Sequence, residues 1–69
     1  RQMCKETDYN PTTCLAIEDS VNGATAAMLA GLDVVVNTNI ITKDQDFSTV
    51  QYVGQDMEFE DIKNFLFKE

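Results

Sequence analysis

The chain contains two continuous apolar runs of strand length. Residues 14–17 (CLAI) are apolar without interruption and are followed abruptly by Glu18 and Asp19. Residues 34–36 (VVV) form the second run, which is entirely β-branched. Apolar runs without polar alternation are typical of strands that are covered on both faces, as in parallel sheets, and β-branched residues favour strands. The pattern therefore predicts two buried strands.

Between the two runs, the apolar positions follow the spacing of a helix. Ser20 is a good N-cap, and the carboxylate of Asp19 suits the positive end of a helix. The predicted buried face, which is rich in alanine and can lie close to a sheet, consists of Val21, Ala24, Ala27, Met28 and Gly31. Gly31 also stands where a glycine ends many helices. Residues 14–37 thus predict a βαβ unit with parallel strands and a right-handed crossover.

The N-terminal segment has a weaker pattern. Residues 1–7 are interpreted as the end of a helix, and residues 8–13 as a loop, because Asn-Pro breaks a helix. Cys4 would then lie in the helix and Cys14 at the start of a buried strand. We expect both to remain reduced thiols.

The C-terminal half predicts one further strand and one further helix. Residues 38–49 are polar and irregular, and the pair Ile40-Ile41 is their expected apolar anchor. Residues 51–54 indicate a short strand at the sheet edge. Residues 58–68 predict an amphipathic helix, with acidic residues in its first turn and Lys68 near its end, as suits the helix dipole. The apolar face of this helix consists of Phe59, Ile62, Phe65 and Leu66.

Composition excludes several classes of function. The chain has 69 residues, a net charge of −7, two cysteines and no histidine. The lack of histidine excludes a Ser-His-Asp or Cys-His relay, and the residue counts exclude the usual four-ligand Cys/His zinc site. Five scattered basic residues form no patch for nucleic acid or an anionic membrane. No apolar run approaches the ~20 residues of a membrane span and no secretory signal opens the chain, so we expect a cytoplasmic protein.

The predicted architecture is a partial one. Two or three parallel strands with helices do not cover both faces of a sheet, and parallel sheets have more strands and helices on each side. We therefore expect residues 1–69 to be part of a larger α/β core.

Two neighbouring acids form the first candidate site. Glu18 and Asp19 stand at the carboxyl end of a predicted strand, where open parallel sheets bind ligands. Adjacent strand residues point in opposite directions, so one carboxylate would bind a metal and the other would act next to it or through water. Mg²⁺ suits this arrangement because it keeps several waters. Alternatively, Asp19 and Ser20 only cap the helix and Glu18 is solvated; the residues alone leave both interpretations open.

Residues 44–48 form a second candidate. Asp44, Asp46 and Ser48 have the spacing of an aspartate-nucleophile loop in phosphoryl transfer. Such a nucleophile should follow a buried strand directly, and no apolar run precedes it here. We therefore predict a solvated loop that Phe47 fixes by pointing inward.

The string of residues 14–32 resembles the fourth motif of the haloacid dehalogenase-like hydrolase superfamily. That motif consists of an apolar strand, Glu-Asp-Ser, two residues, Gly and an alanine-rich helix ending in Ala-Gly. Further residues resemble one branch, the β-phosphoglucomutase-like and CbbY-like sugar-phosphate phosphatases. These are Asn22-Gly23, the valine strand ending at Asn37, and Thr42 followed by Asp46, Phe47 and Ser48.

The resemblance implies a Rossmann-like three-layer core and a Mg²⁺-dependent phosphatase. Its substrate would be a small phosphorylated metabolite, such as a sugar phosphate, processed through a phospho-aspartate. Asp19 would be the direct Mg²⁺ ligand, Glu18 its neighbour, and Ser20 the helix cap. The chain would be the C-terminal fragment of the core, packed against a missing N-terminal half. The nucleophile and the cap domain would lie outside it, so we expect the chain to hold no catalytic residue and to be inactive alone.

Two alternatives remain. One is a phosphomutase of the β-phosphoglucomutase type. The other is a non-catalytic acidic α/β interaction module, similar to part of a signalling receiver domain. A receiver needs a phospho-acceptor aspartate at the end of the next strand, and this chain has Asn37 there.

Overall fold

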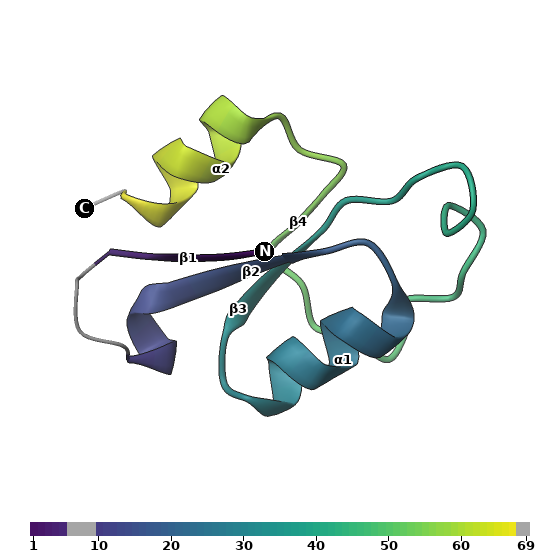
Figure 1. The fold of residues 1–69 in the computed structure, drawn as a ribbon, viewed down its shortest axis with the longest axis horizontal. Coiled ribbons are helices and arrows are strands. Elements are labelled where there is room, and N and C mark those ends of the chain that lie inside the picture. The colour runs from purple at the N-terminus through teal and green to yellow at the C-terminus, as the bar shows by residue number, and fades with distance from the viewer. Residues whose placement is uncertain (6–9, 68–69) are drawn as a thin grey trace.

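Two helices pack on opposite faces of a four-stranded, mostly parallel sheet in the computed structural model, which describes residues 1–5 and 10–67 (Figure 1). The sheet order is β1-β2-β3-β4; β1 is antiparallel to β2, and the other neighbours are parallel. The strands are β1 (Gln2–Cys4), β2 (Cys14–Glu18), β3 (Asp33–Val36) and β4 (Gly54–Gln55), and the helices are α1 (Val21–Leu29) and α2 (Phe59–Leu66). The arrangement is compatible with a partial α/β fold.

The βαβ unit predicted over residues 14–37 is confirmed. β2 and β3 are parallel and α1 connects them. Ser20 caps α1, since its Oγ accepts from the Gly23 N–H at 3.2 Å. At the other end Gly31 has a φ of 86°, a conformation that glycine adopts without steric cost. The Leu32 N–H then bonds to the Ala27 carbonyl at 3.1 Å, which completes a glycine-dependent helix end.

The α1 face of the sheet has a core of small and medium-sized side chains. Ala24 and Ala27 of α1 pack over β2 and β3, and the loop after β3 contributes Phe47 and Val50. From the strands, Ala16, Val34 and Val36 belong to this cluster. The inward position of Phe47 confirms its predicted role, and the alanines allow a close approach between helix and sheet.

The α2 face is covered by a second cluster. Leu15 and Val35 point to this side, because successive strand residues alternate between faces, and Ile62 and Leu66 of α2 cover them. Phe59 and Phe65, which were predicted to share the apolar face, lie outside this cluster and are 44% and 39% exposed. The helix spans Phe59–Leu66 rather than 58–68; residue 58 is its N-cap position, and residues 68–69 lie outside the described residues. Each sheet face thus carries one of the two predicted helices.

The interpretation of the N-terminal segment was wrong. Gln2–Cys4 is a strand, β1, and not the end of a helix, and Cys4 and Cys14 form a disulfide instead of remaining reduced. Hydrogen bonds run from Ile17 N–H to Arg1 O and from Lys5 N–H to Thr13 O. Cys4 and Cys14 face each other between these bonded pairs.

The pairing register of β1 and β2 explains the disulfide between Cys4 and Cys14. In an antiparallel pair, side chains come closest at the positions that exchange no hydrogen bonds, and the Cα atoms of Cys4 and Cys14 are 4.0 Å apart. Of the segments predicted as a helix end and a loop, residues 6–9 lie outside the described residues, and Pro11–Thr13 forms a 3₁₀ helix.

The expected anchor of the loop after β3 was also wrong. Ile40 and Ile41 are each 87% exposed. Thr42 is buried instead, with Phe47 and Val50. The side chain of Asn39 organises this turn, since its Oδ1 accepts from the N–H groups of Ile41 at 2.8 Å and Thr42 at 2.9 Å.

The predicted third strand exists but is displaced. β4 comprises Gly54–Gln55 instead of 51–54, and it pairs with Val35 and Val36 at the edge of the sheet. In the part of the chain that the structure describes, no helix has the length and apolar character needed to cross a bilayer.

Candidate functional site

The carboxyl ends of the parallel strands meet at one edge of the sheet. Asp19 comes directly after β2, Asn39 follows β3 by a short link, and Asp56 comes directly after β4. In open α/β sheets, ligands bind outside the carboxyl ends of the strands. The sequence prediction placed the site at this edge, and the structure adds residues from two neighbouring strand ends.

Asp19 is exposed and its carboxylate is held by the next strand end. Oδ2 of Asp19 accepts a hydrogen bond from Nδ2 of Asn39 at 3.0 Å. The helix-cap alternative is confirmed for Ser20, whose Oγ accepts from the Gly23 N–H, but not for Asp19. The Val21 N–H donates instead to Oε1 of Gln45 at 2.8 Å. Because these acceptors cap α1, the Asp19 carboxylate is not used as the capping acceptor.

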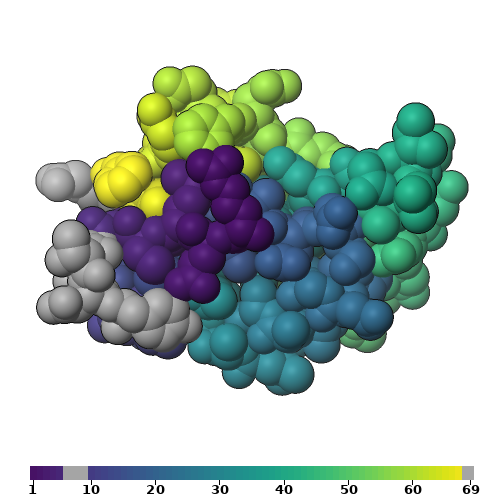
Figure 2. All heavy atoms as spheres, in the orientation of Figure 1, coloured from purple at the N-terminus to yellow at the C-terminus, as the bar shows by residue number. Residues whose placement is uncertain are grey.

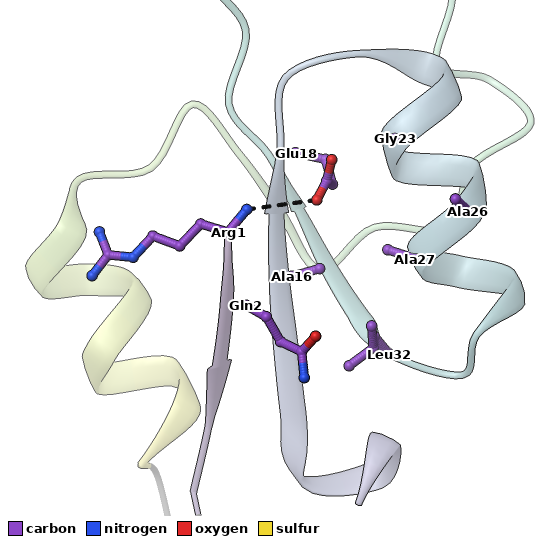
Figure 3. Close-up of a pocket in the computed structure, with 8 residues that line it drawn as sticks. All are labelled: Arg1, Gln2, Ala16, Glu18, Gly23, Ala26, Ala27 and Leu32. Atoms are coloured by element: carbon purple, nitrogen blue, oxygen red, sulfur yellow. Dashed lines mark ion pairs between the residues drawn. The ribbon is translucent and has the colours of Figure 1, made fainter. Parts of the chain in front are cut away.

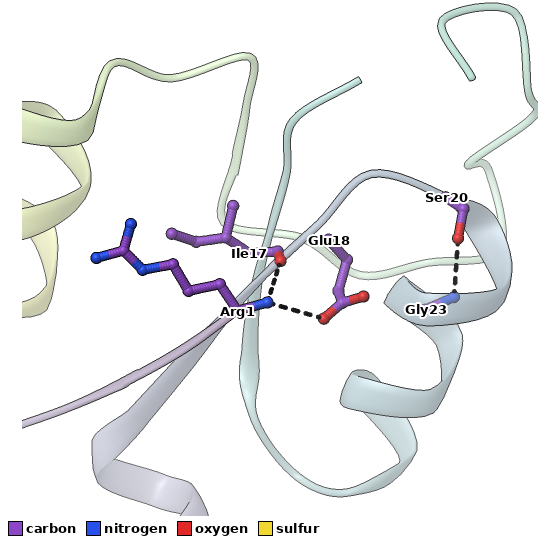
Figure 4. A network of polar contacts seen from close by, with 5 residues as sticks. All are labelled: Arg1, Ile17, Glu18, Ser20 and Gly23. Carbon is purple, nitrogen blue, oxygen red and sulfur yellow. Dashed lines mark hydrogen bonds and ion pairs between the residues drawn. The ribbon is translucent and has the colours of Figure 1, made fainter. Parts of the chain in front are cut away.

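Glu18 points away from Asp19, onto the α1 face of the sheet. Its carboxylate lies between β2 and the first turn of α1, in a hollow of about 400 Å³ that is open next to β1 (Figure 3). Oε2 of Glu18 is 3.7 Å from the α-amino group of Arg1, which also donates to the Ile17 carbonyl at 3.0 Å (Figure 4). The side chain of Glu18 is 28% exposed.

Gly23 has a specific reason to be a glycine. A Cβ at this position would collide with the Glu18 carboxylate. The lack of a side chain at Gly23 therefore leaves room for the side chain of Glu18. The two acids of the pair therefore have different neighbours, as the alternation of strand side chains requires.

Two further polar contacts fix the ends of β3 and β4 to each other. The Asn37 side chain donates to the Met57 carbonyl at 3.0 Å and accepts from the Met57 N–H at 2.9 Å. Oδ1 of Asp56 accepts from both the N–H and the hydroxyl of Thr38, at 2.9 and 3.0 Å. Asp56 adopts a φ of 51°, which aspartate tolerates better than most residues. These contacts make the edge next to Asp19 a connected surface.

A shallow hollow of about 450 Å³ lies on this edge. It is lined by Asn37, Thr38, Asn39, Ile40, Lys43 and Asp56. Asn39 borders the hollow and also bonds to Asp19. The hollow therefore adjoins the Asp19 carboxylate and carries one ammonium group and one carboxylate.

Sequence reasoning missed Asn39, Gln45 and Asp56. For Asn39 a signal was present: Asn followed three residues later by Thr allows reciprocal bonds between side chains and backbone, as in a capping box. The Asn39 N–H does donate to Thr42 Oγ1 at 3.0 Å. For Gln45 and Asp56 no local signal exists, because their partners are Val21 and Thr38, 24 and 18 positions away.

The residues at the edge allow a magnesium site with few protein ligands. Among residues 1–5 and 10–67, no group of three or more His, Cys, Asp or Glu side chains converges to hold a metal. Mg²⁺ is commonly bound through one or two carboxylates, several waters and substrate phosphate. The exposed Asp19 carboxylate fits the role of a direct ligand. Glu18 would act only through water or after its side chain has turned.

The loop with Asp44, Asp46 and Ser48 is solvent-exposed, as predicted. Oδ1 of Asp46 accepts from the Ser48 N–H at 2.9 Å. This bond lowers the pKa of Asp46 below its ordinary value of 3.8, and the nearby Ser48 side chain lowers it further by a smaller amount. The carboxylate thus stabilises its own turn and does not follow a strand, unlike an aspartate nucleophile.

No protein-family model, curated protein or solved structure matches this chain. The resemblance to the haloacid dehalogenase-like superfamily therefore depends on the sequence motif alone.

Proposed function

We propose that this chain supplies the magnesium-binding edge of a haloacid dehalogenase-like phosphatase that acts on a small phosphorylated metabolite, such as a sugar phosphate. The observation that supports this most directly is the position of Asp19. Its carboxylate is exposed at the carboxyl end of β2, bonds to Asn39 from the neighbouring strand end, and is not used to cap α1.

In this proposal Asp19 is the direct ligand of Mg²⁺, and Glu18 contributes through water. When bound, the ion would neutralise negative charge on the phosphate during phosphoryl transfer. Asn39 acts as a positioning residue, since its amide restrains the Asp19 carboxylate. The nucleophilic aspartate belongs to a part of the enzyme outside this chain, so the chain alone is inactive.

The layer arrangement supports a Rossmann-like core. α1 and α2 cover opposite faces of a sheet in which β2, β3 and β4 are parallel. In the proposed enzyme, the missing half of the core would extend this sheet. The phosphomutase alternative uses the same metal position.

The test is a titration of the protein and of three variants with Mg²⁺, in which NMR amide shifts measure the binding. Asp19→Asn should weaken Mg²⁺ binding by at least about tenfold, because it removes the charge of the direct ligand. Glu18→Gln should weaken it less. Asp44→Asn is the matched control, since it removes the same charge from an exposed loop position.

The shifts on Mg²⁺ addition should concentrate at the amides of Asp19, Ser20 and Asn39. The folding stability of Asp19→Asn should change little, because an asparagine oxygen can still accept from Asn39 and the caps of α1 are elsewhere. Equal Mg²⁺ affinities for Asp19→Asn and Asp44→Asn would contradict the proposed site.

A further inference from the structure

We propose that the Cys4–Cys14 disulfide is a redox-controlled latch. A dithiol reductant would release β1 from the sheet and expose the edge of β2, while β2, α1 and β3 stay folded. The inference does not depend on the proposed metal site, because it concerns the opposite edge of β2 from the one that β3 occupies.

Apart from the disulfide, β1 is held by its backbone bonds to β2 and by exposed contacts of Arg1 with Glu18 and the Phe59 ring. It is three residues long, lies at the edge of the sheet and pairs with β2 alone. Of its residues, only Met3 packs against a core cluster, and it is partly buried. Figure 2 places the N-terminal segment at the molecular surface, between α1 and α2. Edge elements with few buried contacts have the lowest local stability in a fold.

β2, α1 and β3 are stabilised by contacts that do not involve β1. β2 contributes buried Leu15 and Ala16 to clusters on both sheet faces, and it pairs with β3 over four residues. α1 is capped at both ends and packs over both strands. The loss of β1 therefore removes one outer strand and leaves the βαβ unit with its partners.

The sulfur atoms of Cys4 and Cys14 are not equally accessible to a reductant. Cys4 is half-buried, whereas Cys14 is 2% exposed. An incoming thiolate would therefore form a bond to Sγ of Cys4, and the S–S bond would break with release of the Cys14 thiolate, which takes up a proton. The second thiol of the reductant, as its thiolate, would then attack its own sulfur in the mixed disulfide. Cys4 leaves as a thiolate and is protonated, the reductant becomes a cyclic disulfide, and two electrons have been transferred.

A polar contact favours the second step. Nε2 of Gln2 lies 3.5 Å from Sγ of Cys4 and donates to it. A donor at this sulfur stabilises the Cys4 thiolate as a leaving group, and thiols that leave as better stabilised thiolates leave faster.

Release of β1 would change the surface at two places, Ile17 and Leu15. The N–H and carbonyl groups of Ile17, which now bond to Arg1, would become available. Leu15 would lose the cover of Met3. An unpaired strand edge of this kind can accept another extended segment. The oxidised state would therefore close this edge, and the reduced state would open it.

The test is amide hydrogen exchange of the protein with and without dithiothreitol. Lys5 and Ile17 report on the β1–β2 bonds, whereas Asn37 and Leu32 report on β3 pairing and the end of α1. Reduction should accelerate exchange at Lys5 and Ile17 by at least about tenfold and leave Asn37 and Leu32 within about twofold. The control is a Cys4→Ala/Cys14→Ala variant, which should show the reduced pattern under both conditions.

Two outcomes would overturn the proposal. Unchanged exchange at Lys5 and Ile17 after complete reduction would mean that β1 stays paired without the disulfide. Accelerated exchange at all four amides would mean that the disulfide stabilises the entire fold and not only β1. The double variant distinguishes an effect of the reductant from an effect of the bond itself.

Discussion

A graded series of leucine substitutions on α1 tests the packing of this helix on the sheet. Ala24 is fully buried in the cluster beneath α1, and Ala27 is 7% exposed. Ala26, on the same helix, is exposed. Leucine and alanine have similar helix propensities, so differences among the three variants report on packing.

The expected costs follow from what each side chain faces. Ala24 is fully buried and packs against β2 and β3. Ala24→Leu should therefore lose about 2–3 kcal/mol of folding free energy, at the upper end for overpacked cores. Ala27 also borders the hollow of about 400 Å³ near Glu18, which can take part of the side chain. Ala27→Leu should therefore lose only about 1 kcal/mol.

Ala26→Leu is the matched control and should stay within about 0.5 kcal/mol of the parent. Urea unfolding followed by circular dichroism measures all three, and for a domain of this size a loss of 2 kcal/mol lowers Tm by roughly 8–16 °C. If the three variants unfold at the same urea concentration, α1 does not lie close to the sheet. If Ala27→Leu costs as much as Ala24→Leu, the hollow does not accept the larger side chain.

Two further predictions concern the loop after β3. Gln45→Ala removes the acceptor for the Val21 N–H at the start of α1 and should lower the free energy of unfolding by about 0.5–1 kcal/mol. Gln45→Glu keeps an acceptor at this position and should retain most of the stability in urea unfolding. Equal losses in the two variants would show that the bond does not stabilise the helix. Because Ser48 lowers the pKa of Asp46 in the folded turn, the turn is stabilised above the ordinary carboxyl pKa of 3.8 and loses this contribution as the pH falls through the lower folded pKa. Ser48→Ala keeps the N–H but removes the hydroxyl, so an NMR titration should show the pKa of Asp46 moving part of the way towards 3.8; an unchanged pKa would exclude a role for the hydroxyl.

The βαβ unit could be predicted because its signals are local and agree with one another. Uninterrupted apolar runs define both strands, Ser20 and Gly31 define the helix ends, and the spacing of alanines defines the buried face. The strands and the helix ends are confirmed. The face is confirmed for Ala24 and Ala27, with Val21 and Met28 partly buried beside them, whereas Gly31 is exposed. Phe47 could also be placed, because a lone aromatic residue in a polar loop gains most by burial.

The errors lie where distant residues decide the structure. Nothing within Gln2–Cys4 distinguishes a frayed helix end from an edge strand; the strand forms because β2 offers an unpaired edge. The disulfide follows from that pairing, since the register brings Cys4 opposite Cys14. An error in one element therefore produced the error in the oxidation state of the cysteines.

The prediction that Ile40 and Ile41 are buried was wrong for a different reason. Hydrophobicity predicts that the two isoleucines are buried, but the backbone of this turn is fixed by the Asn39 side chain and by buried Thr42. This turn directs both isoleucines to the surface, where each is 87% exposed. A local hydrogen-bond motif thus outweighed the burial of two apolar side chains.

The tripeptide Glu18-Asp19-Ser20 shows how one short motif divides its roles by geometry. The end of β2 places Glu18 on the α1 face, where Gly23 leaves room for its carboxylate. The chain then turns, so that Asp19 projects at the strand end towards Asn39, and Ser20 caps α1. Because Gln45 and Ser20 accept from the N–H groups of Val21 and Gly23, the Asp19 carboxylate is not needed as their acceptor. A substitution at Asp19 can therefore separate the proposed metal site from helix stability, which a substitution at Ser20 cannot do.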